Sequence, residues 1–344
     1  KAPGPGFRRD ARKMGAVAAV LLLSACAAPM VQAPSTPPAG FAGPRIEDRA
    51  LVVRDGARLS YLRWSPDGPP RAVVVALHGM NDTYAAFRLA GPWWAEHGVE
   101  TWAYDQRGFG RSPGKGVWAG ETAMTDDLRD VTALVRAARP GVPVIVVGES
   151  MGGSVAIAAF ASDDPPDADR VLLLAPGVWG WSSQGPLNGA ALWVAARAMG
   201  DHAVGTPAFV TRRILASDNM VELIRNGRDP ASVVQTRFDT LSGLVDLMET
   251  ASTSLGQVRR PTLLMYGADD RVVAKGPMRR ALEQAGDAPN LLTAWYPQGR
   301  HLLNRDLNAE VVYRDALAFF LDPSQPLPSR PEPVLDALGG PVPR

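Results

Sequence analysis

The sequence predicts an α/β fold in which a mostly parallel central sheet is covered by helices on both faces. Short apolar runs rich in β-branched residues alternate with longer segments of helical periodicity, which is typical of such a sheet. The predicted parallel strands are residues 72–77, 99–104, 142–147, 170–175, 261–266 and 291–295. The predicted helices include residues 123–138, 151–161, 275–285 and 311–321. At 344 residues, the chain is long enough to bury one full core in a single domain.

Two further elements lie outside this regular alternation. Residues 50–54 and 58–64 flank an Asp-Gly pair and predict a leading antiparallel hairpin, because Asp-Gly is favoured in tight hairpin turns. Residues 177–258 separate the fourth and fifth parallel strands and show helical periodicity without a strong strand. We therefore expect this insertion to form a helical cap within a domain that spans residues 46–322.

The composition excludes several classes of function. The chain has 36 basic and 35 acidic residues and a formal charge of +1, so bulk charge does not favour binding to nucleic acid. Cys26 is the only cysteine, which excludes an internal disulfide and a zinc site built from cysteines. The sequence also shows no histidine and carboxylate cluster with the spacing of metal ligands. We therefore expect no nucleic-acid partner, no metal and no cofactor.

The first 25 residues have the composition of a secretory signal. Four basic residues between positions 8 and 13 precede the apolar residues 15–23, a stretch far shorter than the ~20 residues that a membrane span needs. The sequence Leu-Ser-Ala-Cys that ends at Cys26 resembles the bacterial lipoprotein signal, in which lipid is attached to the cysteine and cleavage occurs just before it. The resemblance implies a protein anchored by lipid at a membrane of the bacterial cell envelope, facing the periplasm or the exterior. The alternative is an ordinary cleaved signal with an incidental cysteine.

Proline-rich segments flank the expected domain. Residues 26–45 are rich in Pro, Ala, Ser and Gly, cannot build a core, and are expected to form an extended tether between the lipid and the domain. Residues 323–344 are again proline-rich and are expected to lie along the surface or to be disordered. The folded part should therefore begin near Ile46.

A candidate nucleophile follows the third predicted parallel strand. The sequence Gly-Glu-Ser-Met-Gly at residues 148–152 stands between a buried strand and a helix. It matches the G-x-S-x-G nucleophile elbow in the strand-turn-helix context that gives this motif its meaning. A serine that only caps the helix is the alternative. The context favours Ser150 as the nucleophile of a hydrolytic enzyme.

The remaining members of a catalytic triad are sought further along the chain. A serine hydroxyl becomes a good nucleophile when a neighbouring imidazole takes its proton. Where a nucleophile elbow is present, the triad follows the order serine, acid, histidine, which selects His301 as the base. The acid should follow the strand at residues 261–266, where Asp269 and Asp270 compete. The earlier histidines are expected to be supporting, packing or surface residues, namely His78, His97 and His202.

Attack on a carbonyl carbon creates an oxyanion, which needs preorganised backbone N–H donors. The residue after the nucleophile supplies one such donor, which is Met151 here, and a loop after an early strand supplies another. The loop at residues 78–81 directly follows the first predicted parallel strand, and Met80 is the expected donor within it. His78 is expected to support this loop.

These motifs together resemble one branch of a known enzyme superfamily. With the sequence Asp-Gln-Arg-Gly-Phe-Gly-Arg-Ser-Pro-Gly at residues 105–114, the chain resembles the monoacylglycerol lipase and lysophospholipase branch of the α/β hydrolases, often labelled serine aminopeptidase-like. The resemblance covers about residues 51–321 and implies an α/β-hydrolase fold. Because the family's acid stands three residues after a glycine, it selects Asp270 and leaves Asp269 as the alternative. Asp105 is expected to stabilise its own turn and to have no catalytic role.

The substrate is expected to depend on the cap. Three tryptophans with aliphatic neighbours would line an acyl-chain channel, or would simply pack the cap onto the body; they are Trp179, Trp181 and Trp193. The first hypothesis is a serine hydrolase that cleaves carboxylic esters through an acyl-enzyme. Its expected partners are a small-molecule or lipid ester, such as a monoacylglycerol or a lysophospholipid, and a membrane that holds the lipidated N-terminus.

Two alternatives come from other classes. An amidase or aminopeptidase with the same triad would need an acidic group to hold a free amino terminus. The candidates for this group are Glu149, Glu222 and Asp246. The second alternative is a non-catalytic envelope lipoprotein on a hydrolase fold. Loss of a triad residue usually accompanies such a change, and the sequence retains a candidate for each position.

Overall fold

The computed structural model describes residues 28–205 and 214–339. Cys26 and the signal segment before it lie outside the described residues. Within the described ranges, no helix combines the length and the apolar character required to cross a membrane.

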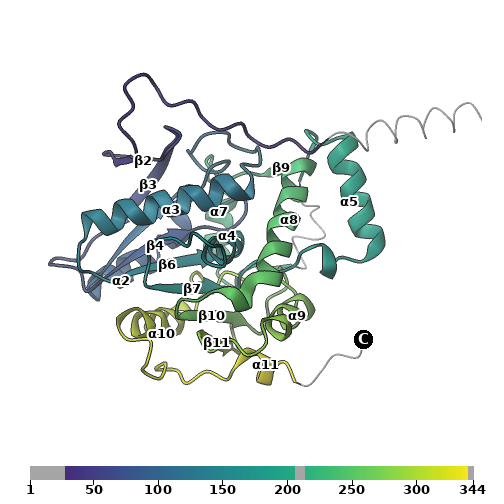
Figure 1. Ribbon diagram of the computed structural model, residues 1–344. Coiled ribbons are helices and arrows are strands. Elements are labelled where there is room, and N and C mark those ends of the chain that lie inside the picture. Colours follow the sequence, from purple (N-terminus) through teal and green to yellow (C-terminus); the bar gives the residue numbers. More distant parts are fainter. Residues whose placement is uncertain (1–27, 206–213, 340–344) are drawn as a thin grey trace, which may run out of the picture.

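A nine-stranded sheet forms the centre of the molecule, as Figure 1 shows. The strands lie in the order β1-β2-β3-β5-β4-β6-β7-β10-β11, and all neighbours from β5 through β11 pair in parallel. Their bounds are β1 (Arg45–Ile46), β2 (Ala50–Val52), β3 (Arg58–Trp64), β4 (Ala72–Leu77), β5 (Val99–Tyr104), β6 (Val144–Glu149), β7 (Arg170–Leu174), β10 (Thr262–Gly267) and β11 (Leu291–Tyr296). The predicted parallel strands and the antiparallel hairpin of β2 and β3 are confirmed.

β6 ends two residues later than the sequence predicted. Gly148 pairs with Leu77 of β4 and Leu173 of β7, and Glu149 pairs with Leu174. The central position of β6 explains the difference, because strands on both sides continue the hydrogen-bonded ladder through the first residues of the motif. Ser150 is therefore the first residue after the strand.

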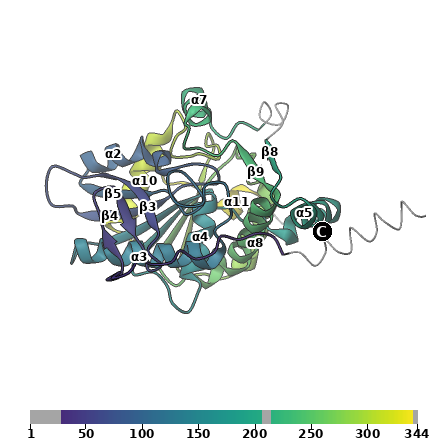
Figure 2. The same cartoon turned by 90° about the horizontal axis from the view of Figure 1, so that it is seen from above.

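Helices cover both faces of the sheet (Figures 1 and 2). One face packs against α3 (Glu121–Ala138), α4 (Met151–Phe160), α8 (Phe238–Ser254) and α9 (Lys275–Ala285). The other face packs against α2 (Ala90–Glu96) and α10 (Ala309–Leu321). Successive residues of β4 alternate between the two cores, with Val73 and Val75 in the first and Val74 and Ala76 in the second. This alternation explains why each central strand is apolar throughout.

The insertion between β7 and β10 has two structural parts. Its first part holds η2 (Trp181–Ser183), α5 (Pro186–Ala198), β8 (Ala203–Gly205), α7 (Met220–Arg228) and β9 (Gln235–Arg237). In both views α5 lies at the outer edge of the molecule, beside α8 (Figures 1 and 2). The second part is α8 itself, whose Leu247 and Ala251 are buried in the core against the sheet. η3 (Leu255–Gln257) then leads into β10.

β8 and β9 form a short antiparallel pair within the insertion, which was expected to hold no strong strand. Each strand has three residues, which is too short for an alternating pattern to be recognised in the sequence. The pair connects the end of α5 to the start of α8.

The N-terminal segment before β1 lies against the body. The backbone N–H of Gln32 donates to Trp118 O at 2.8 Å, and its side-chain amide donates to Val117 O at 2.6 Å. Further along, the N–H of Ser35 donates to an Asp55 carboxylate oxygen at 2.9 Å. Regular structure begins at β1, close to the expected start of the domain, but contact with the body begins at Gln32 or earlier in the expected tether.

The C-terminal segment covers the free edge of β11. Trp295 N–H donates to Glu332 O at 2.9 Å, and Val334 N–H donates to the Thr293 hydroxyl at 3.0 Å. Val334 begins α11 (Val334–Ala337) and is fully buried. The described part of the expected tail therefore lies along the surface, where it covers an edge strand that would otherwise expose unpaired backbone groups.

Replacement of Gln32 by alanine should destabilise the fold without affecting its architecture. The change removes the bonds from the side-chain amide to Val117 O at 2.6 Å and to Gly114 O at 3.2 Å, and a typical hydrogen bond contributes a net of about 1 kcal/mol. Urea unfolding followed by circular dichroism measures the difference. Gln284→Ala, on the exposed side of α9, is the matched control and should change the free energy of unfolding by less than about 0.5 kcal/mol. Equal stability of the two variants would contradict a docked N-terminal segment.

Candidate active site

The sheet topology brings the predicted triad residues to one edge. Ser150 follows β6, Asp270 follows β10 and His301 follows β11. These strands run parallel, with only β7 between β6 and β10. Because the carboxyl ends of parallel strands meet at the same edge, the three residues lie where open α/β sheets place their ligands.

The backbone at Ser150 forms a sharp, strained turn. Its φ is 52° and its ψ is −116°, a conformation that costs a residue with a side chain on the order of 1–3 kcal/mol. Three backbone hydrogen bonds hold it: Ser150 N–H donates to Leu174 O at 3.0 Å, and Ser150 O accepts the N–H groups of Gly177 at 2.9 Å and Ser154 at 3.1 Å. A Cβ at Gly152 would lie 2.4 Å from Leu77 O, so the motif needs glycine there for close backbone packing. The turn matches the expected nucleophile elbow.

Asp270 and His301 form a buried pair. The two atoms His301 Nδ1 and Asp270 Oδ2 lie 2.8 Å apart, and the residues are 3% and 5% exposed. The other carboxylate oxygen of Asp270 accepts the N–H groups of Val272 at 2.8 Å and Val273 at 2.9 Å. Asp269 is exposed. Of the two competing aspartates, the structure therefore brings Asp270 to the histidine.

The surroundings of His301 favour its protonated form. Burial by itself lowers the pKa of His301, whereas the Asp270 charge, its hydrogen bond and the nearby Glu149 raise it. The net pKa lies above the ordinary value for histidine. The site is thus arranged to stabilise an imidazolium, the species that forms when His301 takes a proton from a nucleophile.

The expected oxyanion loop lies directly against the elbow. A Cβ at Gly79 would lie 3.2 Å from Ser150 Cβ, which places the loop after β4 beside the candidate nucleophile. Asn81 has a φ of 64°, so the loop turns sharply just after Met80. Met151 begins α4, and the first N–H groups of a helix have no partner within it. The main chains of both expected donors thus belong to segments that meet at Ser150.

His78 and Asp105 have structural roles in this wall of the site. His78 Nε2 accepts the Gln106 N–H at 3.0 Å, and its Nδ1 lies 2.7 Å from Gly79 O, so it donates there. The Gln106 side chain in turn donates to His78 O at 2.7 Å. Asp105 accepts the N–H of Arg111 at 2.8 Å, within its own turn. These bonds join the expected oxyanion loop to the loop that begins at Asp105.

Comparison with known proteins identifies the family. The serine aminopeptidase S33 family of hydrolases matches residues 68–308, which is more than half of the chain. The chain belongs to this family. The match spans all three residues of the expected triad.

Relatives and solved structures agree with this assignment. The monoacylglycerol lipase of Mycolicibacterium smegmatis is 24% identical over 77% of this chain and 94% of its own length. The monoglyceride lipase of Mus musculus is 24% identical over 75% of this chain and 84% of its own length. The crystal structure of a soluble variant of monoglyceride lipase from Saccharomyces cerevisiae is 20% identical, with a TM-score of 0.65, over 85% of this chain and 99% of that chain. The predicted α/β-hydrolase fold and the resemblance to this branch are confirmed, and the protein is a serine hydrolase.

The three cap tryptophans have different surroundings. Trp181 donates from Nε1 to Asp246 of α8 at 2.6 Å, a contact that joins the first part of the insertion to α8. Trp193, on α5, is 40% exposed, and the Arg197 guanidinium lies 4.0 Å from the centre of its ring. Trp179 lies two residues after Gly177, whose N–H binds Ser150 O. The contact of Trp181 therefore supports a packing role. Contact between the substrate and any of the three tryptophans stays a prediction.

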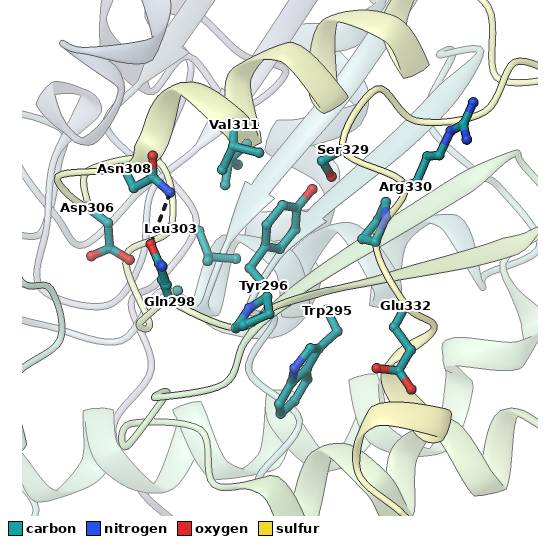
Figure 3. Close-up of a pocket in the computed structure, with 14 residues that line it drawn as sticks. Trp295, Tyr296, Gln298, Leu303, Asp306, Asn308, Val311, Ser329, Arg330 and Glu332 are labelled. Atoms are coloured by element: carbon teal, nitrogen blue, oxygen red, sulfur yellow. Dashed lines mark hydrogen bonds between the residues drawn. The ribbon is translucent and has the colours of Figure 1, made fainter.

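A pocket lies among β11, the segment that follows it, α10 and the C-terminal segment (Figure 3). Its volume is about 360 Å³, and its walls include Trp295, Tyr296 and Val311, with Gln298 and Asn308 joined by a 3.4 Å hydrogen bond. The expected triad residues do not line it. It is thus a separate hollow next to the candidate active site. In the described part of the chain, no group of three or more histidine, cysteine or acidic residues could hold a metal ion.

A buried ion cluster beside the elbow was missed by the sequence reasoning. Arg305 binds Asp82 Oδ2 through Nη1 at 2.6 Å and Glu149 Oε1 through Nη2. The sequence held only a weak signal for this cluster, namely a charged residue in or next to each of three expected catalytic segments. Nothing in the sequence connects them, because they are brought together only by the fold.

Replacement of each aspartate in turn should show whether Asp270 or Asp269 is the acid of the triad. Asp270→Asn should lower kcat toward an ester on the order of 10⁴-fold, because the amide no longer holds the imidazole in the required tautomer. Asp269→Asn is the matched control and should stay within about threefold of the parent enzyme, because Asp269 is exposed. Steady-state kinetics with a p-nitrophenyl ester gives both values. A larger loss in the Asp269 variant would reverse the choice.

Proposed function

We propose that the protein cleaves carboxylic esters through an acyl-enzyme formed on Ser150. The observation that carries the proposal is the buried pair of Asp270 and His301, held at the same sheet edge as the strained turn at Ser150. A nucleophile, a base and a group that orients the base are the three parts that this chemistry requires. Family membership supports it independently.

The contacts of each residue suggest its role. His301 Nδ1 is bonded to Asp270, so Nε2 is left to take the proton from the Ser150 hydroxyl as its oxygen attacks the ester carbonyl. The backbone N–H groups of Met80 and Met151 stabilise the oxyanion. Collapse of the tetrahedral intermediate releases the alcohol, which receives the proton from His301. Water then attacks the acyl-enzyme by the same route and releases the acid and Ser150.

We further propose a single-chain lipid ester as the substrate, such as a monoacylglycerol or a lysophospholipid. Relatives that match along three quarters of this chain are a monoacylglycerol lipase and a monoglyceride lipase. The insertion also exposes large apolar side chains that would suit an apolar substrate. Those on α5 are Leu187, Trp193 and Val194, and those on α7 are Met220, Val221 and Ile224.

The acidic residues considered for an aminopeptidase already have partners. Glu149 pairs with Arg305, and Glu222 pairs with Arg88 and Arg225. Asp246 accepts the Trp181 indole N–H at 2.6 Å. A carboxylate that holds a substrate ammonium group would have to give up these contacts. This observation favours ester substrates over peptides with a free amino terminus.

We also propose that lipid on Cys26 holds the enzyme at a membrane of the bacterial cell envelope. The support is the sequence Leu-Ser-Ala-Cys after a basic and an apolar stretch, and the place of the sole cysteine in it. Gln32 is docked on the body, and only six residue steps separate it from Cys26. A fully extended chain of this length spans about 20 Å, so the lipid would lie close to the domain.

Ser150→Ala should abolish labelling by a fluorophosphonate probe and lower kcat toward p-nitrophenyl esters by at least about 10⁴-fold. Ser162→Ala, in the exposed turn that follows α4, is the matched control and should keep both activities. A panel of monoacylglycerols, lysophospholipids and amino-acid anilides then defines the substrate class. Preference for anilides would favour the aminopeptidase, and folded parent protein that is not labelled would favour a non-catalytic lipoprotein.

Cys26→Ser should prevent lipid attachment in a bacterial host. Growth with an alkyne fatty acid should label the parent protein and leave the variant unlabelled, because the thiol is the expected acceptor. Fractionation should move the variant from the membrane to the soluble fraction, while its ester hydrolysis persists. Equal labelling of both proteins would contradict the anchor without affecting the proposed chemistry.

A further inference from the structure

Three charged side chains form a buried cluster next to the candidate nucleophile. Arg305 is 1% exposed, Glu149 is fully buried and Asp82 is 4% exposed. The guanidinium of Arg305 donates through Nη1 to Asp82 Oδ2 at 2.6 Å and through Nη2 to Glu149 Oε1. One cation therefore joins two carboxylates in the interior.

Each member of the cluster belongs to a different candidate catalytic segment. Glu149 immediately precedes Ser150. Asp82 N–H donates to Gly79 O at 3.3 Å, so Asp82 ends the turn that holds Met80. Arg305 lies in the turn after His301, where its N–H donates to Leu302 O at 2.8 Å. A single guanidinium thus connects the segments that carry the expected nucleophile, oxyanion donor and base.

Stability alone does not account for this cluster. Burial removes three charges from water, and apolar residues of similar volume often serve a core at least as well as buried ion pairs do. Burial also raises the pKa of Glu149, against the opposing charge of Arg305. Within the described residues, Glu149 Oε2 and Arg305 Nε are buried and have no hydrogen-bond partner. The Arg305 cluster thus leaves two buried polar atoms without a partner in the described residues, and a buried polar group without a hydrogen bond is unfavourable for stability.

The charges of the cluster also act on the base. The nearby Glu149 raises the pKa of His301, and Arg305 lowers it. Both effects require that the cluster lie close to the imidazole. A shift of Arg305 or Glu149 would therefore change the environment of His301 as well as its position.

We propose that Arg305 is a positioning residue for the reaction. Its planar guanidinium binds Asp82 and Glu149 at the same time. It thereby fixes the position of the His301 turn relative to Ser150 and the oxyanion loop. A lysine at this position would present one point charge in place of a rigid fork, so it could not hold both carboxylates in the same geometry. The proposal rests on the proposed function, in which Ser150 and His301 react.

A second buried arginine that binds two carboxylates provides a matched control for Arg305. Arg107 is 3% exposed and also joins two carboxylates, through Nη1 to Asp55 Oδ2 at 2.6 Å and through Nη2 to Asp127 Oδ1 at 2.7 Å. Its partners lie in the β2–β3 turn and on α3, away from the three segments. Arg107 follows Gln106, which binds His78, but its own ion pairs connect none of the three segments. Arg107→Lys therefore disturbs a similar buried cluster and leaves the bonds of Arg305, Asp82 and Glu149 in place.

The test compares Arg305→Lys with Arg107→Lys in kcat, KM and melting temperature, with a soluble p-nitrophenyl ester. Active sites are counted by fluorophosphonate titration, so that unfolded protein does not affect kcat. Arg305→Lys should lower kcat by about 10- to 100-fold with KM changed less than about threefold, because a small displacement of reacting groups has such an effect. Arg107→Lys should keep kcat within about twofold at a similar loss of melting temperature. Equal kcat values for the two variants would overturn the proposal.

A second pair of variants tests the same contact from the other side. Glu149→Gln keeps the shape of the side chain and an oxygen that accepts from Arg305, whereas Glu149→Met keeps only the volume. The glutamine variant should retain at least about tenfold more kcat than the methionine variant, and similar losses in both would contradict positioning through this bond. Failure of the proposed function is distinguishable, because the parent enzyme itself would then not hydrolyse the ester or Ser150→Ala would still do so.

Discussion

The parallel pairing of β6, β7, β10 and β11 is the constraint on which the candidate site depends. Glu149 pairs with Leu174, and β7 and β11 lie on either side of β10 in register with it. These ladders place the ends of β6, β10 and β11 at one edge of the sheet, with β7 between β6 and β10, and each of the three strands is followed by one residue of the expected triad. The fold tolerates the strained turn at Ser150 because the turn is fixed between a strand and a helix that are both buried in the core.

Charged and polar contacts orient the side chains that the sheet brings to this edge. Asp270 is itself fixed by two backbone N–H groups, so it can hold His301 in one orientation. Glu149 raises the pKa of His301 and Arg305 lowers it. The interior next to Ser150 is therefore polar and ordered, although the strands that lead to it are almost entirely apolar.

The insertion is connected to the same polar network. Glu222 of α7 pairs with Arg88 of the body, and Asn226 of α7 donates to Asp82 at 3.3 Å. Asp82 also accepts from Arg305, so the contacts run without a break from α7 to the segment before Ser150. α8, by contrast, packs against α4 and the sheet as part of the body. The position of α7 and the geometry of the candidate site are thus physically linked.

The sequence by itself determined the features that depend on neighbouring residues. The elbow at Ser150 is recognisable because its strand, turn and helix are contiguous, and the order of the triad leads to His301. The family resemblance favoured Asp270 over Asp269, and the tertiary structure shows that Asp270 contacts the histidine while Asp269 is exposed. The tertiary structure also revealed the contacts of Arg305 with Asp82 and Glu149, which lie 223 and 156 residues away in the chain. Such contacts leave no local pattern, because the pairing of distant segments is a property of the folded sheet and its loops.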